Sequence, residues 1–408
     1  MSGIRKFAKA IGLSSIGMTF LKIGLAAVLM WYVISQIETR DRLVEIPPDD
    51  GPPVVLAYGD LQGEWQEGGE WQFQPEDESQ PPVRSQDLKP NQEPRPGFFT
   101  LLAGLRVGFY AAAIGFWMVL LSVVTWRWQI LLRAAGVTTG YFNAMRLCFI
   151  GYFFNNAMPG LTGGDLVRAV LVTRGLESNR TKAAMSVIVD RLIGLFSLVL
   201  LAGLVLAFGD IQGADGQEIR HLDTVAQGVF LFLLAAVIGG CVYLSRRIRR
   251  WVRLDKILGI LPAKGAISKL DDAVTVYRSH PGAVLTALVL SLILQACGVM
   301  SFWAVGKALG AELEVAHDFV IFPVVQTISS IPLTPPAGWG VGETLYGKFF
   351  EWFGSAFTLG VAVSVLFRLT TQMGFGLVGG LVWVLSREKK QGMKLAEMKD
   401  NGETETSE

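Results

Sequence analysis

The chain of 408 residues is a succession of apolar stretches separated by polar segments. About 20 apolar residues, at a rise of 1.5 Å per residue, cross a hydrocarbon core roughly 30 Å thick. The last stretch is longer than this, so its helix must tilt or extend beyond the core. The pattern predicts six transmembrane helices, over residues 16–37, 98–126, 187–208, 225–244, 282–306 and 356–386.

Two further apolar stretches, residues 141–164 and 319–342, are interrupted by proline and glycine. The first ends in Asn-Asn-Ala-Met-Pro-Gly-Leu-Thr-Gly-Gly, followed by aspartate, and the second in Pro-Leu-Thr-Pro-Pro-Ala-Gly-Trp-Gly-Val-Gly, followed by glutamate. Proline removes a backbone donor and glycine destabilises a helix, so neither stretch is expected to remain helical throughout. Non-helical backbone at membrane depth is tolerated only where protein or water surrounds it. We therefore expect two re-entrant hairpins.

Composition supports a membrane protein and excludes two other classes. Hydrophobic residues make up 51% of the chain, charged residues 17%, and the formal net charge is +1. Soluble proteins contain roughly 25% charged residues, so a soluble single-domain enzyme is excluded. A nucleic-acid-binding protein is excluded because it needs a strongly basic surface. The expected fold is all-α and polytopic, with about six full transmembrane helices and two inverted re-entrant hairpins.

The distribution of charge predicts the orientation. Residues 245–281 contain nine basic and three acidic side chains, whereas residues 38–97 contain fourteen acidic and five basic ones. Positively charged loops stay in the cytoplasm, so both termini are expected there, in a multi-pass protein of the cell (inner) membrane. Arg127 and Arg133, before the first hairpin, are assigned to the cytoplasmic side. The hairpins then enter from opposite faces, an arrangement typical of a transporter site near the midplane.

The outward segment 38–97 differs from the rest of the chain. It contains ten of the 17 prolines, and much of it is expected to be irregular. A Gly-Glu-Trp-Gln sequence at 63–66 and 69–72 also allows a small hairpin with residues 54–58, and the choice stays open. The expected parts are residues 1–37 with the first helix, the inserted loop 38–97, the transmembrane core 98–390 and a disordered cytoplasmic tail 391–408.

Cysteine and histidine give no sign of metal or redox chemistry. Cys148, Cys241 and Cys297 lie far apart in apolar stretches, and the three histidines are equally isolated. The sequence contains no metal-ligand spacing, nucleotide-binding loop or nucleophile motif. We therefore expect no metal, no cofactor and no catalytic residue of a recognisable soluble enzyme.

The first hairpin carries candidate chemistry for an anion. Gly163, Gly164 and Asp165 open a predicted helix over residues 165–172, and free amides at a helix N-terminus suit a phosphate. Arg168 lies one turn further on and is suited to grip a phosphodiester. For Asp165, a role as the N-cap of its helix is equally compatible with the sequence.

Other charged positions lie on the predicted spans. Asp190 and Arg191 are near the cytoplasmic end of theirs, where a structural salt bridge is at least as compatible as a ligand site. Arg368 lies twelve residues into the last span, and a charge at that depth is costly unless it is paired or hydrated. By sign, Glu343 at the tip of the second hairpin is its first expected partner, followed by Asp165.

Three motifs occur along the chain in a defined order. Asn155-Asn156-x-x-Pro159-Gly160 runs on to Gly163-Gly164-Asp165-x-x-Arg168, followed by Ser186-x-x-x-Asp190-Arg191 and by Pro332-x-x-Pro335 to Gly342-Glu343. Together they resemble the lysylphosphatidylglycerol synthase transmembrane family over about residues 10–390, the outward loop excepted. The resemblance implies a protein that handles lipids. The soluble aminoacyl-transferase domain of the synthases has no counterpart in this sequence, and the aspartate before Arg191 is a mild departure from a glutamate in relatives.

The sequence thus favours a protein that binds an anionic phospholipid or lipid-linked headgroup and moves it between leaflets. Its partner is membrane lipid and not nucleic acid, and its oligomeric state stays open. A membrane-embedded transferase with Asp165 or Glu343 as general base, and a non-catalytic scaffold subunit, are the alternatives. The candidate headgroup-binding residues are Asn155, Asn156, Gly163, Gly164, Asp165, Arg168, Asp190, Arg191, Gly342, Glu343 and Arg368.

Overall fold

The structure is a computed structural model that describes most of the chain. Predictions about the basic N-terminal segment, the basic loop 245–275 and the C-terminal tail concern residues outside the described ranges, as do those about most of the hairpin tips. The described residues are 15–47, 53–65, 69–89, 91–157, 163–174, 176–208, 220–244, 276–330, 334–335 and 338–386.

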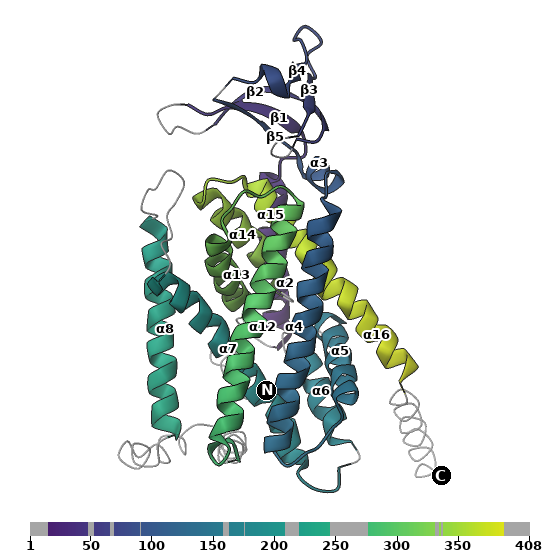
Figure 1. Ribbon diagram of the computed structural model, residues 1–408, viewed down its shortest axis with the longest axis vertical. Coiled ribbons are helices and arrows are strands. Elements are labelled where there is room, and N and C mark those ends of the chain that lie inside the picture. The colour runs from purple at the N-terminus through teal and green to yellow at the C-terminus, as the bar shows by residue number, and fades with distance from the viewer. Residues whose placement is uncertain are drawn as a thin grey trace. The chain divides into compact units, whose positions relative to one another are not determined.

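Four helices of the described chain are long and apolar enough to cross a membrane (Figure 1). They confirm a polytopic helical membrane protein, while the count of six spans stays a prediction. Two more apolar helices, α2 (Ser15–Gln36) and α8 (Arg220–Leu244), coincide with predicted spans. The four candidate membrane spans are α4 (Val107–Ala134), α7 (Arg180–Phe208), α12 (Pro281–Ala308) and one continuous helix near the C-terminus. The continuous helix is made of α15 (Phe357–Arg368), the π-helical turn η4 (Leu369–Gly374) and α16 (Phe375–Leu385).

The span predicted over residues 98–126 is wrong at both ends. A separate short helix, α3 (Phe98–Ala103), ends at Gly104, whose N–H donates to the carbonyl of Thr100. The long helix α4 begins only at Val107 and continues past Arg127. A charged residue was expected to end the span, but Arg127 is buried inside the protein.

Each of the two interrupted stretches folds as a pair of helices, as their prolines and glycines predict. The first contains α5 (Tyr141–Ala157) and α6 (Gly163–Thr173), which pack against each other. The second contains α13 (Val315–Ser329) and α14 (Val341–Trp352), which are also in contact. The helical breaks are therefore confirmed. The re-entrant position of the two hairpins in a membrane stays a prediction.

Residues 38–97 contain a folded antiparallel sheet, so the expectation of an all-α fold is wrong, and so is the expectation that much of this segment is irregular. Side chains alternate between its faces, and one face buries Leu43, Leu61, Trp71 and Phe73. The two Gly-Glu-Trp-Gln sequences meet in the β2–β3 hairpin, where Gly63 pairs with Trp71. In the order β4-β3-β2-β1-β5, the strands are β1 (Asp41–Glu45), β2 (Val54–Gly63), β3 (Trp71–Pro75), β4 (Val83–Arg84) and β5 (Gln92–Arg95).

A buried carboxylate holds the sheet together at its base. Asp41 accepts hydrogen bonds from the backbone N–H groups of Leu61, at 2.7 Å, and Gly97, at 2.6 Å. Directly before β1, the N–H of Glu38 donates to the Oγ1 of Thr358 in α15, at 3.0 Å. These contacts join segments far apart in sequence, which explains why local composition did not reveal the sheet.

The chain forms two compact units, and each contains one helical hairpin. In the first unit, Phe302 lies at the centre of an aromatic core with Phe322, Tyr346, Phe350 and Phe367. The first unit comprises Met1–Leu120, Phe196–Cys241 and Leu292–Phe367, with the sheet and the α13–α14 hairpin, and the second comprises Leu121–Leu195, Val242–Ser291 and Arg368–Glu408, with the α5–α6 hairpin.

Candidate functional site

Three charged side chains of the second unit form a buried cluster, here called the arginine cluster. Asp190 on α7 lies between Arg127 on α4 and Arg168 on α6. The Nε of Arg127 donates to one carboxylate oxygen of Asp190 at 2.9 Å, and a terminal nitrogen of Arg168 donates to the other at 2.8 Å. Both predicted residues, Arg168 and Asp190, therefore meet in one place.

The arginine cluster contains more positive than negative charge. Arg127 and Asp190 are each 4% exposed and Arg168 is 8% exposed. Two guanidinium groups share one carboxylate, which leaves one surplus positive charge in a buried position, where an uncompensated charge is costly. The Nε of Arg168 is buried and has no hydrogen-bond acceptor among the described residues. Among the described residues, the cluster thus has one positive charge more than its carboxylate balances and one N–H donor without an acceptor.

Neighbouring side chains hold the two arginines in position. The hydroxyl of Ser291 on α12 accepts a hydrogen bond from Arg127 at 2.8 Å. The guanidinium of Arg168 lies over the indole of Trp128, 4.2 Å from the ring centroid, an attractive cation–π arrangement. The indole N–H donates to the Oγ of Ser186 at 3.1 Å. Each guanidinium group therefore has a second neighbour in addition to Asp190.

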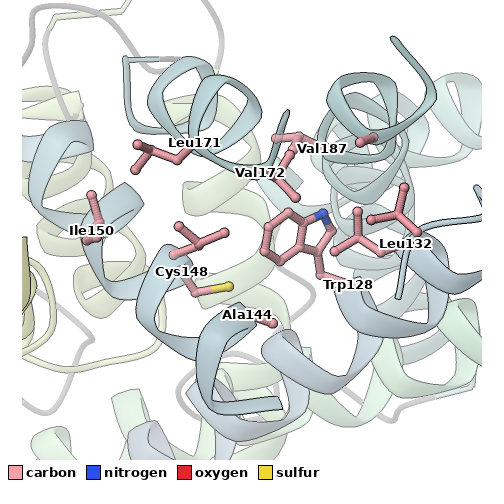
Figure 2. Close-up of a cluster of buried hydrophobic side chains, with 11 residues drawn as sticks. Trp128, Leu132, Ala144, Cys148, Ile150, Leu171, Val172 and Val187 are labelled. Atoms are coloured by element: carbon pink, nitrogen blue, oxygen red, sulfur yellow. The ribbon is translucent and has the colours of Figure 1, made fainter. Parts of the chain in front are cut away.

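Trp128 also anchors the apolar core beneath the arginine cluster. Figure 2 shows its indole ring between Cys148 of α5 and Val187 of α7, with Val172 of α6 beside it. Ala144 and the other members of this core are fully or almost fully buried. The first hairpin is thereby packed against α4 and α7, the two helices that supply Arg127 and Asp190.

The first hairpin is closed by a glycine contact near its tip. A Cβ atom on Gly164 would lie only 1.9 Å from the carbonyl oxygen of Gly151, so only glycine fits. The N–H of Gly164 donates to the Oδ1 of Asn155 at 2.9 Å. The N–H of Gly164, one of the backbone donors predicted to bind a phosphate, is therefore already hydrogen-bonded within the protein. The side chain of Asn156 and the surroundings of Gly163 lie outside the described structure.

Asp165 and Arg191 form a second ion pair, between α6 and α7. Both side chains are partly exposed. Since α6 begins at Gly163, Asp165 lies in its first helical turn, and of the two roles left open for it the N-cap does not hold. The salt bridge proposed for this region exists, but Arg191 pairs with Asp165 while Asp190 pairs with the two arginines.

The second hairpin, in the first unit, places Glu343 differently. Its side chain is fully buried and accepts a hydrogen bond from the N–H of Gly340, the N-cap residue of α14, at 2.6 Å. The hydroxyl of Ser364 donates to its other oxygen at 3.3 Å. Gly340 has φ of 83°, a conformation that favours glycine. Gly342 is buried beside them.

Arg368 is the last residue of α15, directly before the π-helical turn. It is 3% exposed, so it does not face lipid. Thr371, in the turn, is buried as well. Single π-helical turns are frequent at functional sites. The pairing of Arg368 with Glu343 or Asp165 stays a prediction.

The sequence reasoning missed Arg127, Trp128 and Ser291. Arg127 was expected to be a flanking residue outside the span, whereas its side chain is buried among α4, α7 and α12. The side of the membrane on which it lies stays a prediction. The signal available in the sequence was the apolar pattern that continues beyond it, to Leu132. Within the described ranges, no group of three or more His, Cys, Asp or Glu side chains is arranged to hold a metal ion.

Comparison with known proteins identifies the family. Residues 97–379 match the lysylphosphatidylglycerol synthase transmembrane region. The chain belongs to this family. The match includes both helical hairpins and the whole arginine cluster, and it begins after the sheet. No solved structure matches the chain.

Curated relatives from archaea carry the name UPF0104 membrane protein. The protein of Pyrococcus horikoshii is 22% identical over 289 residues, which is 66% of this chain and 85% of the relative. That of Methanothermobacter thermautotrophicus is 22% identical over 270 residues, 62% of this chain and 77% of the relative. That of Methanocaldococcus jannaschii is 20% identical over 293 residues, which is 67% of this chain and 84% of the relative.

Proposed function

We propose that this protein binds an anionic phospholipid or lipid-linked headgroup and translocates it between the leaflets of the cell membrane. The observation that carries the proposal is the surplus positive charge of the arginine cluster. A phosphodiester brings one negative charge and several acceptor oxygens, which would neutralise the second guanidinium and satisfy the Nε of Arg168. Membership in a transmembrane family named for a lipid synthase supports a lipid as the source of that phosphate.

The proposed transport uses the two interrupted hairpins. They are re-entrant segments that enter from opposite faces of a core of six spans, with both termini in the cytoplasm. The headgroup binds at the hairpins while the acyl chains remain in the hydrocarbon. Discontinuous helices at the membrane midplane serve this purpose in many transporters. The proposed headgroup residues are the sequence candidates named above, together with Arg127.

The test is lipid movement in proteoliposomes that contain fluorescent phosphatidylglycerol and an impermeant quencher. Arg168→Gln leaves the neutral pair of Arg127 and Asp190 intact and removes the surplus charge. A charge-assisted hydrogen bond of about 1.5–3 kcal/mol corresponds to a rate lower by roughly 10- to 100-fold. Arg133→Gln is the control, because Arg133 lies on α4, the helix that carries Arg127, and has an exposed side chain outside the cluster.

The other possible outcomes either contradict the proposal or favour another function. Normal lipid movement in Arg168→Gln would contradict the role of the arginine cluster. Turnover of a soluble donor onto a lipid, without movement between leaflets, would favour a transferase. Stable co-purification with a partner protein, with neither activity, would favour a scaffold subunit.

A further inference from the structure

Segments of three helices, all within the first unit, border an apolar groove of about 280 Å³. The groove is separate from the arginine cluster, which belongs to the second unit. Its residues are Val199 and Ala202 of α7, Thr224, Val225, Gly228, Val229 and Phe232 of α8, and Val324, Thr327 and Ile328 of α13.

The spacing of these residues shows that each helix contributes one continuous face. Those on α8 recur at intervals of one, three or four residues, and those on α7 and α13 at intervals of one or three, as expected for neighbours on one helix face. A Cβ atom on Gly228 would meet nothing within 4 Å, so α8 leaves room at this point. On α7, by contrast, a Cβ atom on Gly203 would lie only 2.5 Å from the Cδ1 of Leu233, so α7 and α8 are close together there.

The lining is unsuited to water. Among the described residues that line it, the only polar side chains are two threonines, and the hydroxyl of Thr327 donates to the carbonyl of Pro323 at 2.7 Å, within its own helix. A buried water molecule needs two to four polar partners. The groove therefore favours an apolar occupant.

The groove borders exposed apolar surfaces of the helices. α7 is one of the four candidate membrane spans, and α8 carries an apolar segment from Asp223 to Ala236. Phe230, Leu231 and Leu234, next to the groove on α8, are exposed. In a transmembrane segment, such side chains are covered by lipid tails, so the medium beside the groove is acyl chains.

We infer that this groove binds one acyl chain of a phospholipid. The inference rests on the proposed function, which it extends from the headgroup to the tail. A groove of this kind selects lipids by the shape of the acyl chain. Its volume of about 280 Å³ accommodates part of an acyl chain.

The experiment is photo-crosslinking in proteoliposomes with phosphatidylglycerol that carries a diazirine within one acyl chain. Adducts are mapped by mass spectrometry of peptides. We expect them on the groove faces of α8 and α13. Gly228→Phe fills the groove and should lower these adducts by about tenfold or more, since overpacking is strongly unfavourable. Gly239→Phe is the matched control, because Gly239 also has open space on α8 but does not line the groove.

Adducts spread evenly over α8, or unchanged by Gly228→Phe, would overturn the inference. So would a dimer of this chain that Gly228→Phe dissociates, because a second copy would then occupy the groove. The proposed function is scored separately, by lipid movement. Groove adducts without movement leave the acyl-chain site intact and contradict translocation, whereas normal movement without groove adducts contradicts only the site.

Discussion

Asp190→Asn is the substitution that most directly tests the arginine cluster. Asp190 is the single carboxylate between Arg127 and Arg168, and both of its oxygens accept charge-assisted hydrogen bonds. Asparagine keeps the size and removes the charge, so two buried guanidinium groups would face each other without an acid. Removing one partner of a buried ion pair costs about 3–5 kcal/mol, because the other charge is left uncompensated.

Arg168→Gln provides the comparison within the same cluster. It removes one hydrogen bond to Asp190 and the contact with Trp128, but it leaves Asp190 paired with Arg127. We expect a loss of about 1.5–3 kcal/mol, the size of one hydrogen bond to a charged group. Asp190→Asn should therefore be clearly the more destabilising of the two.

The assay is unfolding by denaturant in detergent micelles, followed by tryptophan fluorescence. Arg133→Gln serves as the control, and we expect it to stay within about 0.5 kcal/mol of the unmodified protein, as for most surface substitutions. If Asp190→Asn proves as stable as the unmodified protein, or more stable than Arg168→Gln, the surplus positive charge assigned to this cluster is wrong.

Three further predictions concern the hairpin, the orientation and the last span. Gly164→Leu should abolish lipid movement and destabilise the α5–α6 hairpin, because a leucine side chain has no room beside Gly151. The expected loss of stability is more than 1 kcal/mol, the lower end of about 1–3 kcal/mol for overpacking, and limited proteolysis of the hairpin measures it. Single cysteines at Gln80 and Ser279, in a cysteine-free background, should react with an impermeant thiol reagent from opposite sides, and labelling from one side contradicts the topology. Arg368→Leu should stop lipid movement while Arg368→Lys retains part of it, since lysine keeps the charge but loses the planar fork; normal movement in the leucine variant makes Arg368 a structural residue.

The helical breaks were predictable because their causes are local. Proline and glycine act on the backbone of their own segment, so α5 and α6, and likewise α13 and α14, could be separated from the sequence alone. The family could be recognised partly for the same reason, since two of its three motifs lie at these breaks.

The arginine cluster was only half predictable because its partners are distant in sequence. Arg127 and Asp190 are 63 positions apart, and Arg127 and Ser291 are 164 apart. A charged residue in an apolar run is compatible with the end of a span or with a buried pair, and hydropathy does not separate the two. The sheet was missed for a related reason, since Asp41 organises it through backbone groups 20 and 56 positions away.

The two hairpins share a sequence pattern but use their acids differently. Asp165 of the first hairpin pairs with Arg191 on another helix, one turn from Arg168 and its surplus charge. Glu343 of the second hairpin binds the N–H of Gly340 and thereby occupies an amide at the N-terminus of α14 with a negative charge of the protein itself. A phosphate approaching that helix would meet a carboxylate and would have to displace it. Of the two proposed hairpin sites, the electrostatics therefore favour the first as the initial contact of an anionic headgroup, while Glu343 without a ligand holds the second hairpin in shape.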